Sequence, residues 1–109
     1  MRLKYVIKFV ADMDRAIAFY ERKLSLPLRF RSPYWSEFDT GETTLALHPA
    51  TPEHAAGSVQ IGFNVEDLDA FYARRHELEI SFGLPPAIRF GTRLATFHDS
   101  EGAECRISS

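Results

Sequence analysis

The chain has 109 residues, about the length of one ordinary domain. Hydrophobic residues make up 45% of it and charged residues 26%, a balance typical of a folded protein rather than a disordered one. The formal net charge of −2 gives no general attraction to nucleic acid. The longest apolar run, from Ala16 to Tyr20, is far shorter than the roughly 20 residues of a membrane helix. We therefore expect a cytoplasmic protein that binds neither nucleic acid nor membranes.

The first half of the chain predicts a strand, a helix and three further strands. Apolar and polar residues alternate over residues 3–10, which predicts a strand. Asp12 is a good N-cap for a helix whose apolar residues recur every three or four positions until Pro27. Three short extended stretches follow at residues 28–31, 35–39 and 43–48. Prolines, alanines and a glycine over residues 49–57 then predict a linker.

The second half of the chain repeats this order. Residues 59–65 predict a strand, Asp67 is a second N-cap candidate, and helical spacing continues to Leu78. Further extended stretches are predicted at residues 80–82, 88–90, 93–98 and 104–108, the last two joined by a turn at residues 99–102.

The two halves are related by an internal repeat. Residues 10–14 correspond to residues 65–69, and Phe19-Tyr20 corresponds to Phe71-Tyr72. A half of about 50 residues would be marginally stable alone, so we expect the halves to share a core within a single domain of residues 1–109. We expect module one at about 1–50, a linker at about 49–57 and module two at about 58–109. A curved sheet built in this way would leave a concave face for a small ligand.

Four segments stand out beside the repeat: V-A-D-M-D-R-A-I-A-F-Y at residues 10–20, E-F-D-T-G at 37–41, L-A-L at 45–47 and D-S-E-G at 99–102. These features resemble the vicinal oxygen chelate superfamily, which includes glyoxalase I, extradiol dioxygenases and bleomycin-resistance proteins, although Ser100 replaces the proline usual in the last segment. The resemblance covers nearly the whole chain and implies an α+β fold of two βαβββ modules that form an incomplete barrel, commonly as a homodimer.

Metal-dependent members of that superfamily carry four ligands, usually His, Glu or Gln, on the first and last strands of the two modules. The resemblance places these ligands at Tyr5, Ala46, Gln60 and Arg106. Only Gln60 has a familiar donor, because Ala46 has no donor atom and Arg106 is a fixed cation without a lone pair. The resemblance therefore implies that the usual metal site is absent, and we expect no metal and no other cofactor.

A displaced metal site is an alternative. His48, Glu37, Glu104 and Gln60 could surround a metal, because His48 shares a strand face with Ala46 and Glu104 shares one with Arg106. Under the opposing interpretation these polar side chains pair with Arg106 or lie at a solvated rim.

We expect the concave face to bind a small organic molecule. Arg106 could hold a planar anion in a fork of N–H groups, Trp35 and Tyr34 could stack on a flat ligand, and Glu37 could attract a cationic group. Structural roles compete with these: an ion pair of Arg106 with Glu37 or Glu104, and core or dimer packing of Trp35 and Tyr34. The predicted ligand-binding residues are Tyr5, Trp35, Glu37, His48, Gln60, Glu104 and Arg106.

Three functions remain open. The leading one is a metal-free binding protein of the bleomycin-resistance type. The second is a lyase, isomerase or dioxygenase that uses a displaced metal, or metal-free chemistry with Glu37 or Glu104 as the base. The third is a non-catalytic dimeric interaction protein, and no catalytic residue is assigned under the leading interpretation.

The remaining reactive side chains are expected to be structural or exposed. Cys105 is the only cysteine, so it forms no internal disulfide, and its alternation with Glu104 and Arg106 directs it toward the packed face. We expect His54 in the linker and His76 on a helix to face solvent. Arg29 and Arg31 alternate along a strand with nothing basic around them, which predicts a solvated face rather than a nucleic-acid patch.

Overall fold

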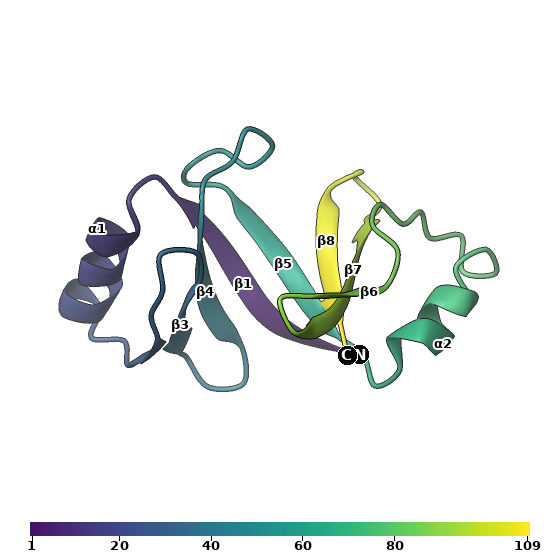
Figure 1. Cartoon of the computed structure of the whole chain (residues 1–109), viewed down its shortest axis with the longest axis horizontal. Helices are drawn as coiled ribbons and strands as arrows, with labels where there is room; N and C mark the ends of the chain where they lie inside the picture. Colours follow the sequence, from purple (N-terminus) through teal and green to yellow (C-terminus); the bar gives the residue numbers. More distant parts are fainter. The chain divides into compact units, whose positions relative to one another are not determined.

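Strands dominate the chain, and each half contains one short α-helix (Figure 1). The structure is a computed structural model that describes residues 1–109. None of its helices has the length and apolarity needed to cross a membrane. The first half contains β1 (Arg2–Val10), α1 (Met13–Ala18), the π-helical segment η1 (Phe19–Lys23), β2 (Leu28–Phe30), β3 (Ser36–Asp39) and β4 (Thr44–Pro49). The second half contains β5 (Val59–Asn64), α2 (Leu68–Ala73), β6 (Ala87–Arg89), β7 (Thr92–His98) and β8 (Glu104–Ser108).

The chain divides into two compact units. One is Lys4–Gln60, and the other joins Met1–Leu3 to Ile61–Ser109. We call them module one and module two, because each contains the strand, helix and three strands of a βαβββ unit. This confirms the expected α+β class and its two repeated modules.

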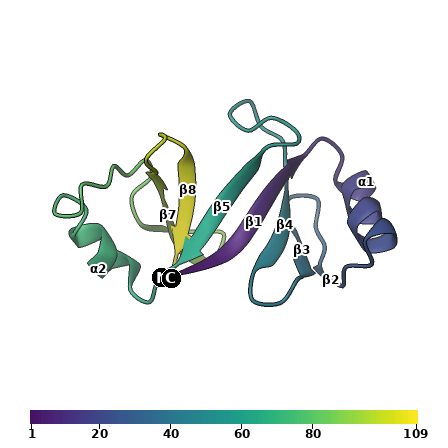
Figure 2. The same ribbon diagram turned by 180° about the vertical axis from the view of Figure 1, so that it is seen from behind.

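The sheet of module one has the strand order β2-β3-β4-β1. β1 and β4 run parallel, in a register that extends from Tyr5 beside Thr44 to Val10 beside Pro49. Parallel neighbours need a crossover connection, and α1 lies within it, beside the strands of this module (Figures 1 and 2). The helix begins where predicted, because Asp12 Oδ1 accepts a hydrogen bond from the Arg15 backbone N–H at 3.0 Å.

Module one buries side chains on both faces of its sheet. Ile17 of α1 packs with Phe38 and Leu47 on one face. On the other face Ile7, Phe9 and Ala46 form a second buried cluster, flanked by Tyr5 and Trp35. The alternation of side chains along β1 and β4 produces this division.

Module two has the strand order β5-β8-β7-β6. Its first and last strands in the sequence, β5 and β8, again run parallel. Asp67 caps α2, accepting from the Ala70 N–H at 3.0 Å, and Leu68 packs with Ala95 and Ile107. The turn predicted at residues 99–102 is confirmed, since Asp99 Oδ1 accepts from the N–H groups of Glu101 and Ala103.

Both helices are shorter than their apolar spacing predicts. α1 ends at Ala18 and continues as η1 to Lys23, whereas α2 ends at Ala73 instead of reaching Leu78. In each module a residue with left-handed backbone closes the helical segment, Ser25 (φ 56°) in one and Glu79 (φ 56°) in the other. The strand expected at residues 80–82 is wrong, because only one bridge, from Phe82 to Phe97, forms there.

Asp67→Ala should lower the free energy of unfolding by about 1 kcal/mol, because the substitution removes the acceptor that caps α2. Asp67→Asn should keep most of the stability, since asparagine caps equally well. Urea unfolding followed by circular dichroism measures both. Equal stability of the alanine and asparagine variants would show that the cap contributes nothing.

Candidate functional site

One face of the module-one sheet carries aromatic and polar side chains opposite the face covered by α1. Tyr5 and Phe9 point to this face from β1, and the register places His48 beside Phe9. Glu37 of β3 lies opposite Ala46 of β4, on the same side. We call the set Tyr5, Phe9, Trp35, Glu37 and His48 the aromatic face. The structure therefore brings together four of the seven residues predicted to bind a ligand.

The Trp35 indole is held from several sides. Its Nε1–H donates to Glu37 Oε2 at 2.7 Å. The Tyr5 ring meets it edge-on, with centroids 5.6 Å apart and planes at 79°. The His48 ring is also nearly perpendicular to it, at 6.3 Å. Trp35 is half-buried, so it is not fully enclosed by these contacts.

Glu37 has an ion-pair partner within module one. Its Oε1 accepts from Arg29 Nη2 at 3.0 Å, and Arg29 also donates to the Thr44 hydroxyl. Arg29 is exposed, as expected of a solvated face, and its guanidinium also reaches the half-buried Glu37 carboxylate, which a paired cation stabilises. This pairing balances the charge of Glu37, which corrects the expectation that Glu37 would attract a cationic ligand group.

His48 and His54 are both oriented by their surroundings. His48 Nδ1 lies 2.7 Å from the Pro49 carbonyl oxygen, which can only accept, so Nδ1 is the donor and Nε2 of the neutral ring is an acceptor. His54 stacks on Phe9 with centroids 4.4 Å apart and planes at 10°. The expectation that His54 faces solvent was therefore wrong. The linker folds back so that this ring covers Phe9, which a local pattern does not reveal.

The other three predicted residues lie at or beyond the module boundary. Gln60 is buried, 3% exposed, in the first part of β5. Arg106 of β8 lies between Gly62 of β5 and Thr96 of β7 in the register of module two. Glu104 precedes it on the same face, since Cys105 and Ile107 alternate with them and are buried.

A protein-family comparison covers almost the whole chain. Residues 2–107 match the family model described as Glyoxalase/Bleomycin resistance protein/Dioxygenase superfamily. The chain belongs to this superfamily. The match confirms the resemblance on which the site positions were placed. A search of curated proteins found no significant match.

Several solved structures share the superfamily fold. Methylmalonyl-CoA epimerase from Mycobacterium tuberculosis is similar at a TM-score of 0.82 and 20% identity, over 97% of this chain and 85% of that one. The Streptomyces coelicolor methylmalonyl-CoA epimerase in complex with 2-nitronate-propionyl-CoA is similar at a TM-score of 0.80 and 19% identity, over 99% of this chain and 96% of that one. An NAD-dependent benzaldehyde dehydrogenase from Legionella pneumophila is similar at a TM-score of 0.78 and 21% identity, over 95% of this chain and 96% of that one. At these identities the likeness shows the fold alone.

The metal-ligand positions of the superfamily in module one hold poor donors. Ala46 is fully buried beside Ile7 and Phe9, and Tyr5 offers a phenol rather than a carboxylate or imidazole. Of the displaced set, Glu37 already accepts from Arg29 and Trp35. No group of three or more His, Cys, Asp or Glu side chains is arranged to hold a metal ion. These donors do not fit the usual metal.

Cys105 points into the packed side of module two, as predicted. Its side chain is 2% exposed, and burial raises the pKa of the thiol, with the nearby carboxylates of Asp99 and Glu104 adding to the effect. A raised pKa keeps the thiol protonated at neutral pH, and the protonated form is a poor nucleophile. Cys105 is therefore a packing residue.

Native protein should react with a chromogenic disulfide reagent at pH 7.5 at least about tenfold more slowly than protein unfolded in urea, because Cys105 is buried and protonated. The absorbance of the released thiolate measures the rate. Comparable rates in the two states would mean that the thiol is accessible in the folded protein.

Proposed function

We propose that this superfamily member is a metal-free protein that binds a small organic molecule, with the aromatic face of module one as part of the binding surface. The observation that carries the proposal is the half-buried Trp35, whose indole is fixed by Glu37 and by the Tyr5 ring. Rigid aromatic side chains offer a large contact area at little entropic cost.

The geometry favours a flat ligand that carries a hydrogen-bond donor. Trp35 supplies an aromatic surface, and His48 Nε2 supplies an acceptor because Nδ1 is occupied by the Pro49 carbonyl. The charge of Glu37 is balanced by its ion pair with Arg29, so we do not expect the aromatic face to select a cationic ligand. A hydroxylated or amino-substituted planar ring combines the two features that these residues recognise.

We also propose Gln60, Glu104 and Arg106 as ligand-binding residues. The Arg106 guanidinium would hold a carboxylate or similar planar anion on the ligand through two parallel hydrogen bonds. We propose that the protein acts as a homodimer, as is common in the superfamily. Binding is favoured over acid–base catalysis by Glu37, because Trp35 and Arg29 each engage one of its carboxylate oxygens.

Trp35 is the only tryptophan, so its fluorescence reports on this face directly. In a titration with a panel of planar phenols and anilines, at least one compound should change Trp35 emission saturably. His48→Phe should weaken binding of that compound by about tenfold, since it keeps a ring but removes the acceptor. Calorimetry measures the dissociation constants.

Tyr34→Ala serves as the matched control, because Tyr34 precedes Trp35 but is 77% exposed and outside the aromatic face. This variant should bind like the wild type. If no compound in the panel changes Trp35 emission, or if His48→Phe binds as tightly as the wild type, the proposed site is wrong.

A further inference from the structure

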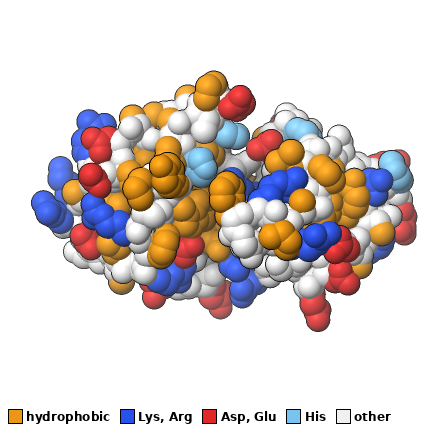
Figure 3. All heavy atoms as spheres, in the orientation of Figure 1, with side chains coloured by type: hydrophobic (Ala, Val, Ile, Leu, Met, Phe, Trp, Pro, Cys, Tyr) orange, Lys and Arg blue, Asp and Glu red, His pale blue; other side chains and the backbone are white.

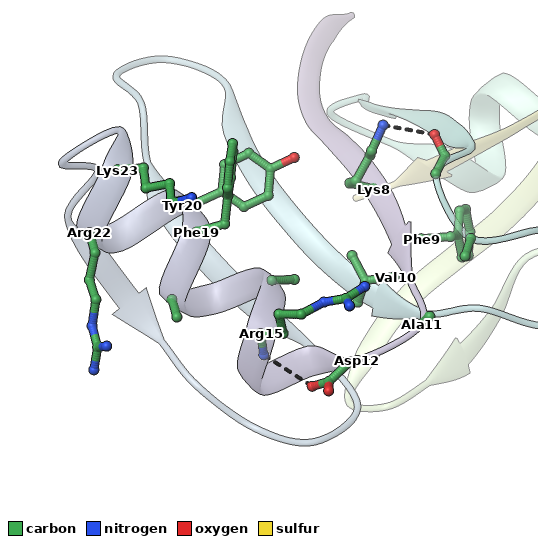
Figure 4. Close-up of a pocket in the computed structure, with 14 residues that line it drawn as sticks. Lys8, Phe9, Val10, Ala11, Asp12, Arg15, Phe19, Tyr20, Arg22 and Lys23 are labelled. Carbon is green, nitrogen blue, oxygen red and sulfur yellow. Dashed lines mark hydrogen bonds between the residues drawn. The ribbon is translucent and has the colours of Figure 1, made fainter.

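A second surface of module one is a groove of about 690 Å³ between α1 with η1, the end of β1 and the linker (Figure 4). Its volume is in the range of sites for small organic molecules. Val10 and Ala16, which line it, pack on the α1 side of the sheet, whereas the proposed ligand site is on the other side. The groove therefore lies mainly on the α1 side of the sheet, and Phe9 is the one residue of the aromatic face that also lines it.

The groove is lined by four cations and one carboxylate. The cations are Lys8, Arg15, Arg22 and Lys23. None of them has an acidic partner, and the one carboxylate, Asp12, accepts from the Arg15 backbone N–H as the helix cap. In Figure 3 several blue side chains, with red ones among them, lie over the part of module one that contains α1. The lining of this groove therefore carries a net positive charge.

The internal repeat provides a comparison. Arg22 and Lys23 correspond to Arg74 and Arg75 by the offset that relates Phe19-Tyr20 to Phe71-Tyr72. In module two Arg74 pairs with Glu77 at 3.2 Å, and Arg75 lies 4.0 Å from the Tyr72 ring centroid and donates to the Tyr72 carbonyl. Of these four cations only Arg74 has an acidic partner, whereas Arg75 and Lys23 each lie over an aromatic ring.

The other two groove cations have no charged counterpart. By the offset that relates the two N-caps, Lys8 corresponds to Phe63 and Arg15 to Ala70. Phe63 packs in the core of module two. The charge of the groove is thus specific to module one rather than a property that both modules need to fold.

The groove also offers an apolar surface beside its charges. Phe19 is 44% exposed, and the Lys23 ammonium lies 5.6 Å from its ring centroid. Several alanines line the groove, so small side chains leave space there. Lys8 Nζ donates to the Gly57 carbonyl at 2.7 Å and joins the linker to β1, and in Figure 4 Arg22 points away from Arg15. Arg15 and Lys23 are therefore the cations best placed to meet a ligand.

We infer that this groove binds a small organic anion with an apolar body. The apolar body contacts Phe19, and the field of Arg15 and Lys23, on either side of that ring, attracts a carboxylate, sulfonate or phosphate group. The anionic group of the ligand and the cations of the groove attract each other, and contact with the Phe19 ring removes apolar surface of the ligand from water. This inference does not depend on the ligand of the aromatic face.

Anilinonaphthalene sulfonate, an aromatic anion, is the probe. Its fluorescence should rise saturably on binding, and its neutral parent, phenylnaphthylamine, should bind at least about tenfold more weakly. Arg15→Gln and Lys23→Gln should each raise the dissociation constant about threefold, and together about tenfold, as expected for exposed ion pairs. Added salt should weaken binding, because these charges are screened. Backbone amide NMR shifts should centre on Phe19 and Lys23.

Arg74→Gln is the matched control, with the same change of charge at the repeat position of Arg22. It should bind the probe like the wild type. The inference is overturned if the neutral parent binds equally well, if the doubly substituted protein keeps its circular dichroism and its affinity, or if the shifts centre on Trp35. The groove substitutions should leave the Trp35 titration unchanged, so failure at one site is distinguishable from failure at the other.

Discussion

The parallel pairing of β1 with β4 is the constraint on which the rest of module one depends. A parallel neighbour must be reached by a crossover, so α1 is carried to one face of the sheet and leaves the other face to the aromatic cluster. Because side chains alternate along each strand, one register decides both surfaces. Tyr5 and His48 lie on one side, and Lys8, beside the α1 groove, lies on the other.

The two modules share the same order of strands and helix but have different surface side chains. Asp12 and Asp67 cap equivalent helices, and a left-handed residue closes each helical segment. At surface positions outside these sites, the shared fold does not require a particular side chain. Module two has Phe63 and Ala70 where module one has Lys8 and Arg15, and Arg74 has an acidic partner where Arg22 has none. Repetition therefore maintains the fold while the charges at equivalent positions differ.

Much of the aromatic face follows from spacing alone. Glu37 and Trp35 are two residues apart, as are Ala46 and His48, so each pair shares a strand face wherever the strands pair. The pairing of Glu37 with Arg29 and the stacking of His54 on Phe9 were not predicted. Both join residues from different elements, and no periodicity within one segment encodes such contacts. The groove was missed for the same reason, since its wall includes the linker.

The sequence by itself determined the order of elements, the two helix caps, the repeat and the family, because each is written in neighbouring residues or in a fixed offset. Tertiary structure decided where each helix stops, which cations find a carboxylate and which stay unpaired. Those outcomes depend on distances between segments far apart in the chain. The residues next to Arg29 and Arg15 in the sequence do not show which of the two has an ion-pair partner. The packing of β2 against β3 brings Arg29 to Glu37, whereas Arg15 lies beside the groove without an acidic partner.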